Sequence, residues 1–246
     1  MKRTALAVCL AAAFCGRASG MHPLVSEDTG FLGKGGRQVE LGLEHAVSRE
    51  GPDIYSNSLC AEISYGLNER ADLLFTVPWQ GWSSAGVSES GPGDLALETK
   101  LRVAEKAGWT FAVKPGLSLA TGDHEKGLGS GKTDLWAYAI AGRTSGPWQF
   151  FLNAGYFLNK NSAGEEAHIL KGSAAVVLEA APRTLVTADL TTETSADPDA
   201  SSHPLSSIFG VAWSPADTLD LDAGVKLGLN DAADDLGLLA GATFRF

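Results

Sequence analysis

The last ten residues read Gly237-Leu238-Leu239-Ala240-Gly241-Ala242-Thr243-Phe244-Arg245-Phe246. Five apolar side chains recur at every second position, so they share one face of an extended strand. These are Leu238, Ala240, Ala242, Phe244 and Phe246. The apolar row continues to the final residue, an aromatic, whereas a soluble enzyme rarely ends in such a strand. The C-terminal sequence therefore predicts an amphipathic strand that continues to the last residue.

The same two-residue alternation recurs along the chain in segments of about ten residues. We count twelve of them: 37–48, 58–66, 71–80, 94–105, 109–120, 134–143, 148–158, 168–180, 184–193, 204–214, 218–229 and 236–246. In 94–105 one face carries Leu95, Leu97, Leu101 and Val103, and the other carries Asp94, Glu98, Lys100 and Arg102. A helix would mix these two sets around its circumference, but a strand separates them.

Short connections alternate with longer ones, of which 81–93 and 121–133 are examples. Tight periplasmic turns and longer outer loops are typical of outer-membrane barrels, and a last strand ending in an aromatic resembles the signal read by the barrel-insertion machinery. We therefore predict an all-β fold, a single antiparallel up-and-down transmembrane β-barrel of about 12 strands over residues 37–246. Counts of 10 and 14 stay open, because 134–143 could turn either face to lipid and 204–214 begins with Pro204.

The N-terminus has the organisation of a secretory signal peptide. Lys2 and Arg3 precede an apolar run over 4–14, which is too short to span a bilayer, and Ala18-Ser19-Gly20 is a small-x-small cleavage site. We predict a signal peptide over 1–20, and an N-terminal periplasmic or lumenal segment over 21–36. The predicted location after cleavage is the outer membrane of a Gram-negative cell.

Charge and composition exclude some classes of protein. The formal net charge is −10, and loss of the three basic residues Lys2, Arg3 and Arg17 with the signal makes it −13. A nucleic-acid partner needs a basic surface and is therefore not expected. The mature chain also has no run of the roughly twenty apolar residues that a membrane helix needs.

The two faces of the predicted strands define two sets of residues, one that lines the lumen and one that lies at the membrane interfaces. An ion in the lipid-facing wall would be costly, so charged rows should face the lumen, where they can be hydrated or paired. The predicted lumen-lining residues are Glu40, Glu44, Glu62, Glu98, Lys100, Arg102, Lys114, Lys171, Lys226 and Arg245. Aromatic rings prefer the bilayer interfaces, so the predicted girdle residues are Tyr65, Trp79, Trp109, Trp148, Tyr156, Trp213 and Phe246.

No motif predicts catalysis, a metal or a cofactor. Residues 127–133 look like a phosphate-binding loop, but that motif needs glycine where Lys126 stands, and a helix should follow it. None of the five histidines is paired at metal-ligand spacing. A lipid-modifying hydrolase stays an alternative, because His45 and His168 fall on apolar faces near the predicted outer ends.

Several motifs together resemble one family. Residues 22–30 and 33–35, the run 114–123 followed by 126–132, and the short stretches 146–148, 153–156 and 224–226 carry the resemblance, as does the ending 239–246. These are similar to the outer-membrane transporter-like family named for the MetA pathway of phenol degradation, over nearly the whole mature chain. The resemblance implies a barrel of a kind thought to admit hydrophobic or aromatic compounds, and implies no catalytic residues.

We therefore predict a porin-like channel for passive passage of small solutes, with hydrophobic or aromatic compounds as the class that the resemblance implies, and not an enzyme. Its expected partners are outer-membrane lipid, the barrel-insertion machinery that reads the C-terminal strand, and a small-molecule solute. Two further alternatives stay open. One is a structural or adhesive barrel that binds a partner through loops 81–93 and 121–133, and the other is a soluble lipocalin-like barrel.

Overall fold

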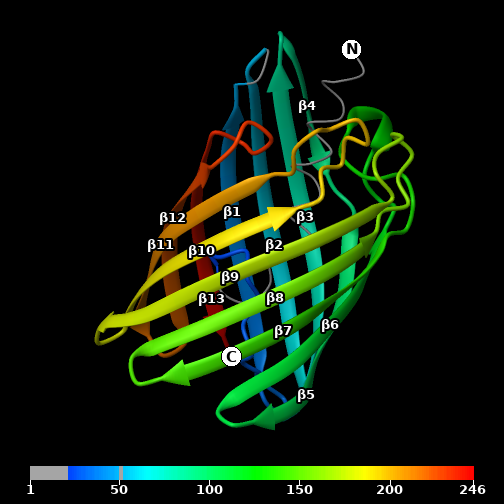
Figure 1. Cartoon of the computed structure of the whole chain (residues 1–246). Coiled ribbons are helices and arrows are strands. Elements are labelled where there is room, and N and C mark those ends of the chain that lie inside the picture. The colour runs from blue at the N-terminus through cyan, green and yellow to red at the C-terminus, as the bar shows by residue number, and fades with distance from the viewer. Residues whose placement is uncertain (1–21, 50–51) are drawn as a thin grey trace.

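Antiparallel pairing joins twelve strands of the chain into a closed ring (Figure 1). The computed structural model describes residues 22–49 and 52–246, so the predicted signal peptide 1–20 lies outside the described residues. The strands are β1 (Arg37–Ser48), β2 (Ile54–Asn68), β3 (Ala71–Ser84), β4 (Val87–Pro92), β5 (Leu95–Lys106), β6 (Trp109–Leu119), β7 (Leu135–Ser145), β8 (Trp148–Leu158), β9 (His168–Ala181), β10 (Thr184–Glu193), β11 (Leu205–Ala216), β12 (Leu219–Gly228) and β13 (Leu236–Arg245). The prediction of a barrel of about twelve strands is confirmed.

The first and last strands close the ring. β1 pairs with β13 from Gln38↔Arg245 to Val47↔Leu236, and it pairs with β2 on its other edge. The C-terminal alternation that predicted a strand therefore forms the seam of the barrel. No helix in the described part of the chain is long and apolar enough to cross a membrane.

The prediction of a loop over 81–93 is wrong, because most of these residues form a β-hairpin that extends the barrel wall. β3 runs on to Ser84 and β4 returns from Val87, with Ala85 (φ 50°) and Gly86 (φ 80°) forming a two-residue turn. Both β4 and β5 pair with β3, and only Gly93 and Asp94 separate them. β4 is thus an outward extension of β5, and the ring itself keeps twelve strands. Its serine-rich sequence carries no apolar row, so the alternation that marks the other strands is absent.

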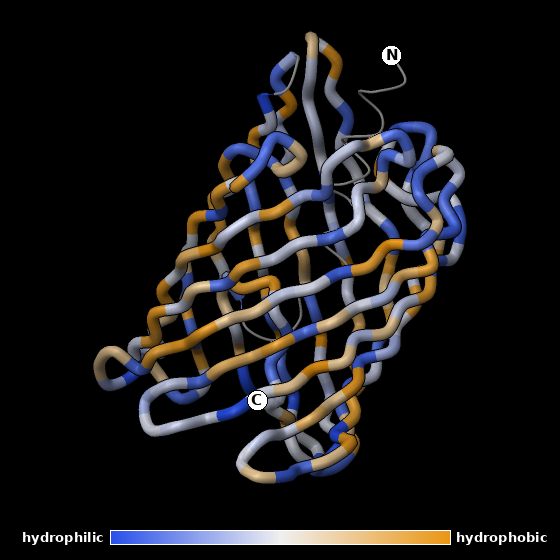
Figure 2. Tube along the Cα trace, in the orientation of Figure 1, coloured by the Kyte–Doolittle hydropathy of each residue, from blue (hydrophilic) through white to orange (hydrophobic). Residues whose placement is uncertain are grey.

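Side chains alternate between an apolar outside and a mixed, largely polar inside. Leu43, Leu59 and Leu152 are about half exposed, at 48%, 47% and 52%, whereas Glu62 and Lys114 are 3% and 0% exposed. Apolar and polar positions alternate along the strands in Figure 2. Because the exposed row is apolar and the enclosed row carries the charges, the barrel presents hydrocarbon-compatible surface outward.

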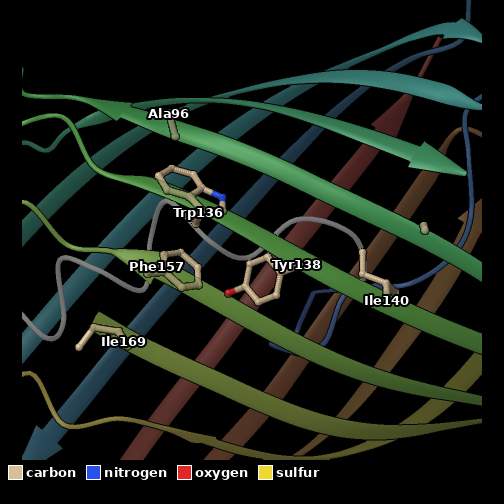
Figure 3. Close-up of a cluster of buried hydrophobic side chains, with 7 residues drawn as sticks. Ala96, Trp136, Tyr138, Ile140, Phe157 and Ile169 are labelled. Atoms are coloured by element: carbon tan, nitrogen blue, oxygen red, sulfur yellow. The ribbon is translucent and has the colours of Figure 1, made fainter. Parts of the chain in front are cut away.

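Strand β7 shows which face of residues 134–143 points outward. Trp136, Tyr138 and Ile140 are buried inside the barrel, and Leu135 is exposed. Two neighbouring strands add Phe157 and Ile169 to the same cluster (Figure 3). One side of the lumen is therefore filled with apolar and aromatic side chains.

Candidate functional site

The structure places all ten predicted lumen-lining residues on the inner face of the barrel. Glu40, Glu62, Glu98, Lys100, Lys114 and Lys226 are buried. Glu44, Arg102 and Lys171 are partly buried, and the Arg245 side chain is 42% exposed near the end of the last strand. That these residues line a path for a solute stays a prediction.

The chain's own residues 22–34 occupy part of the lumen. The segment leads into β1 at the end of the barrel that carries the C-terminus, where Gln38 is the partner of Arg245. The backbone N–H groups of Val25 and Ser26 donate to Asp189 at 3.0 and 2.7 Å. Asn153 accepts from the Glu27 N–H at 2.7 Å and donates to the Glu27 carbonyl at 3.1 Å. Side chains of the wall thus satisfy backbone groups that have no strand neighbour.

Ion pairs hold the middle of this segment. The Lys114 ammonium lies 2.5 Å from Glu27 Oε1 and 3.3 Å from Glu98 Oε1, and all three side chains are fully or almost fully buried. Trp136 Nε1 donates to the same Glu98 oxygen at 2.8 Å. Burial raises the pKa of the Glu27 carboxyl to about 7, and the positive charge of Lys114 acts against this rise. The ionised form of Glu27 therefore depends on Lys114.

Two further polar contacts lie on either side of this centre. Asp28 forms an ion pair with Lys100 of β5, and the His22 ring contacts the Asp222 carboxylate of β12 through Nδ1. Among the predicted lumen-lining residues, Lys100 and Lys114 thus form ion pairs with residues of the segment. The structure pairs Lys226 with Glu44 at 3.1 Å, Lys171 with Glu193 and Arg245 with Asp220.

Apolar contacts of the segment fill one side of the lumen. Leu24 is buried with Phe151, Ala175 and Val177. Phe31 packs against the Trp136 cluster, and its ring centroid lies 4.7 Å from the Arg102 guanidinium. The segment therefore packs against apolar side chains on the side of the barrel built from β5 to β10.

Two wall glycines leave room for the segment. A Cβ at Gly66 of β2 would lie 1.8 Å from the Gly33 carbonyl oxygen, and one at Gly210 of β11 would lie 2.3 Å from Pro23 Cγ. Real Cβ atoms do not approach other atoms so closely, so both positions need glycine while the segment is docked. The wall is shaped to receive these residues.

Three cavities lie beside the segment in the lumen. The largest of the three, about 350 Å³, is lined by residues of the segment, by the inner faces of β1, β2, β3, β12 and β13, and also by side chains of β5, β8, β10 and β11. It shares His22, Glu40 and Glu62 with a cavity of about 40 Å³, which shares Glu44 and Ser58 with one of about 10 Å³ beside Lys226. A space of about 10 Å³ is at the limit for one water molecule. The sequence of cavities therefore narrows to a constriction at Glu44 and Lys226.

Loops at the other end of the barrel are tied to the wall and to one another. Asp94 accepts from the Gly122 N–H at 2.8 Å and from the Ser130 N–H at 2.7 Å. The Ser162 N–H donates to the Ser130 carbonyl at 2.8 Å. A single 3-10 turn (His124–Lys126) precedes residues 127–133 and strand β7 follows them, so this loop is not followed by the helix that a phosphate-binding loop needs.

The predicted girdle residues lie on the outer surface. Tyr65, Trp79, Trp148, Tyr156, Trp213 and Phe246 are exposed, and Trp109 is partly buried. Their contact with the bilayer interfaces stays a prediction. The two histidines of the hydrolase alternative contact Asn57 (His45, 2.9 Å) and Tyr156 (His168, 2.7 Å).

The residues that sequence reasoning missed are those of the segment itself. Glu27 and Asp28 contact the wall through ion pairs and His22 through a hydrogen bond, yet none was placed among the predicted site residues. Asn153, which holds Glu27, was missed as well. Their signal was present as two adjacent acids in a segment expected to enter the lumen.

The family model for the MetA pathway of phenol degradation matches residues 25–246. Among solved structures, an outer membrane channel from Pseudomonas putida F1 is similar, with a TM-score of 0.74, 16% identity and coverage of 89% of this chain and 98% of that chain. The KdgM porin is similar with a TM-score of 0.58 and 8% identity, and the match covers 85% of this chain and 99% of that chain. The translocator domain of the autotransporter NalP from Neisseria meningitidis is similar with a TM-score of 0.56 and 13% identity, and the match covers 99% of this chain and 97% of that chain. These likenesses show the fold, and no curated protein sequence matches the chain.

Proposed function

This chain belongs to the family named for the MetA pathway of phenol degradation, and we propose that it is an outer-membrane channel for small solutes whose lumen is narrowed by its own residues 22–34. The observation that carries the proposal is a row of three cavities that share lining residues, inside a barrel whose exposed outer face is apolar. Delivery to the outer membrane would follow cleavage of the predicted signal peptide.

The filled half of the lumen supports a narrow channel. A barrel of about twelve strands lies between small barrels filled by side chains and wide porins that leave an aqueous channel. Here residues 22–34 fill part of the lumen and pack against apolar side chains of β5 to β10, and the cavities that remain are lined mostly by β1, β2, β3, β12 and β13. A small solute is therefore the largest object that such a lumen would pass while the segment stays docked.

Planar-bilayer recording tests the proposal. The full-length protein should show a small conductance, and deletion of residues 22–34 should raise the single-channel conductance severalfold, because the deletion merges the cavities with the space that the segment fills. Heat-modifiable migration on a gel verifies that both proteins are folded barrels. A deletion variant that is folded but does not conduct would contradict the proposal and favour a structural or adhesive barrel.

Passage of hydrophobic or aromatic compounds, which the family resemblance implies, is tested with the same two proteins. Liposomes loaded with either protein are offered a neutral aromatic solute and a sugar of similar size, and swelling rates are compared. Faster uptake of the aromatic solute supports the family expectation, and faster uptake of the sugar counts against it. An esterase activity abolished by His45→Ala or His168→Ala would instead favour the hydrolase alternative.

A further inference from the structure

Two cationic side chains of the barrel wall face outward instead of into the lumen. Lys106 of β5 and Arg143 of β7 are both exposed, and both are cross-strand partners of Trp109 of β6. The next outward residue of β6, Phe111, is exposed as well. Residues directly opposite each other in a ladder share one face of the sheet. Lys106, Trp109 and Arg143 therefore form one row across three strands on the outer surface.

A shift of register turns Lys106 outward. As far as Arg102, the even-numbered residues of β5 face the lumen, as Lys100 does, and a regular strand would place Lys106 there too. Between Arg102 and Ala104 the register against β6 shifts, and the ion pair of Arg102 with Glu105 at 3.0 Å indicates that these two share the inner face. Bulges at barrel rims re-aim side chains. The local backbone therefore presents Lys106 to the outside.

No acidic group in the described part of the chain pairs with either cation. Lys106 and Arg143 form no ion pair there, and the outward rows of β5, β6, β7 and β8 contain no Asp or Glu. The Arg143 guanidinium lies 5.9 Å from the centroid of the Trp109 ring, and a Cβ on Gly108 would lie 4.0 Å from Arg143 Nε. The guanidinium thus leans across β6 toward the turn that follows Lys106. Two positive charges flank one indole and have no counter-charge.

The row lies at the level expected for lipid headgroups. Lys106 and Trp109 flank the two-residue turn Ala107–Gly108, at the end of the barrel that carries the C-terminus (Figure 1). Short turns of outer-membrane barrels face the periplasm. A cation in the lipid-facing wall is costly at the bilayer midplane and costs little at the interface, where Trp rings also prefer to lie. Phosphate groups of the inner leaflet therefore supply the complementary charge.

The surface next to Arg143 suits an acyl chain. Ala141 and then Ala139 follow Arg143 on the outward row of β7. The cross-strand partners of Ala141 are larger, namely Phe111 on β6 and Leu152 on β8. A low apolar track between bulkier side chains thus leads from the guanidinium toward the middle of the membrane. The cations supply the reason to bind, and this track supplies a place for the chain.

We propose that Lys106, Trp109 and Arg143 bind the headgroup of one anionic phospholipid of the inner leaflet. Neighbouring strands are about 4.8 Å apart, so the backbones of Lys106 and Arg143 are separated by roughly 10 Å, which two long side chains close around one phosphate. A guanidinium donates paired N–H groups to phosphate while it stacks on an aromatic ring. A zwitterionic lipid is bound less well, because its own ammonium competes with the wall cations for the phosphate.

Native mass spectrometry of the detergent-purified protein tests the inference. The protein is offered equal amounts of phosphatidylglycerol and phosphatidylcholine with identical acyl chains. It should retain one phosphatidylglycerol in preference to phosphatidylcholine by about tenfold, and Lys106→Gln with Arg143→Gln should bring the ratio below about twofold. Arg37→Gln is the matched control, because Arg37 is an exposed cation at the same end of β1 whose partner on β2 is Tyr65. That variant should keep the preference.

A second double variant separates lipid binding from damage to the fold. Lys106→Arg with Arg143→Lys preserves both charges and should keep most of the preference, and heat-modifiable gel migration verifies that every variant is a folded barrel. Equal retention of the two lipids by the wild type, or a preference that survives the double Gln variant, overturns the site. A preference lost equally in Arg37→Gln overturns it as well, since diffuse attraction would then suffice. None of these readouts depends on conductance, so the channel proposal is tested separately.

Discussion

The two sides of the lumen differ in how their charges are satisfied. On the side of β5 to β10, Lys114 is fully buried between Glu27 and Glu98, and Leu24 and Phe31 pack against apolar clusters. On the side of β1 to β3, Glu40, Glu62 and Asp72 border an unfilled volume. The segment therefore has its most buried ion pair and its apolar contacts on the first side, and the second side borders most of the unfilled volume, so a solute path would run off the barrel axis. The difference predicts that substitutions on the filled side weaken docking of the segment far more than substitutions on the cavity side.

The largest effect is expected for Lys114→Met. It leaves Glu27 and Glu98 buried without their ammonium, and breaking a buried pair in this way costs about 3–5 kcal/mol. Hydrogen exchange of the peptide that covers residues 22–34 should accelerate strongly, and the single-channel conductance should approach that of the deletion. The double variant with Glu27→Gln should recover part of the protection.

The pH dependence of this variant gives a second readout. Because the pKa of Glu27 is raised to about 7 in the docked state, the docked segment holds a proton more tightly than the free segment. The contribution of Glu27 to docking is thus present at low pH and is lost as pH rises through about 7. Without Lys114 the defect should be larger at pH 8 than at pH 6, and an equal defect at both values would contradict this role of Glu27.

Asp189→Ala should have the next largest effect. It removes the acceptor of the Val25 and Ser26 N–H groups and of the Ser26 hydroxyl, and hydrogen bonds to a charged group contribute about 1.5–3 kcal/mol each. Exchange of residues 22–27 should accelerate most. Asp189→Asn keeps one acceptor oxygen and should have a smaller effect, so equal defects in the two variants would argue against the hydrogen bonds as the cause.

A moderate effect is expected for Gly210→Ala. Its Cβ would lie 2.3 Å from Pro23 Cγ, and overpacking of this kind costs about 1–3 kcal/mol. Gly172→Ala in β9 is the matched control, because its nearest neighbour would be Thr192 Cγ2 at 3.8 Å. Conductance and exchange of the segment should change in the first variant alone.

The smallest effect is expected for Ser64→Ala on the cavity side. Ser64 Oγ donates to Glu62 Oε1 at 3.0 Å, but water in the cavity can replace this donor, so the loss should be about 0.5 kcal/mol or less. The midpoint temperature of the gel-mobility transition should stay near that of the wild type. A defect as large as that of Asp189→Ala would remove the distinction between the two sides.

Much of the barrel could be predicted because its signal is local. Side chains of a strand alternate with period two, so the outward position of Leu97 and the inward position of Glu98 follow from neighbouring residues. The exceptions are equally local. β4 has a serine-rich strand without an apolar row, and in 134–143 both rows are apolar, so alternation could not choose between Trp136 and Leu135.

The candidate site was harder to predict, because its contacts join distant parts of the chain. Glu27 meets Lys114 87 residues later, and Val25 meets Asp189 164 residues later. A pattern can place Lys114 in the lumen but cannot name the carboxylate that neutralises it. The same holds for Gly210, whose need for space arises only when Pro23 lies against it.

The amino-acid sequence alone determined that this chain forms an amphipathic barrel with its charges enclosed, because the pleat of a strand assigns each residue to a face. Only the tertiary structure decided which charges meet, where residues 22–34 lie and which side of the lumen stays unfilled. Those features depend on the closure of the ring and on the distances across it, and neither is encoded in the spacing of neighbouring residues.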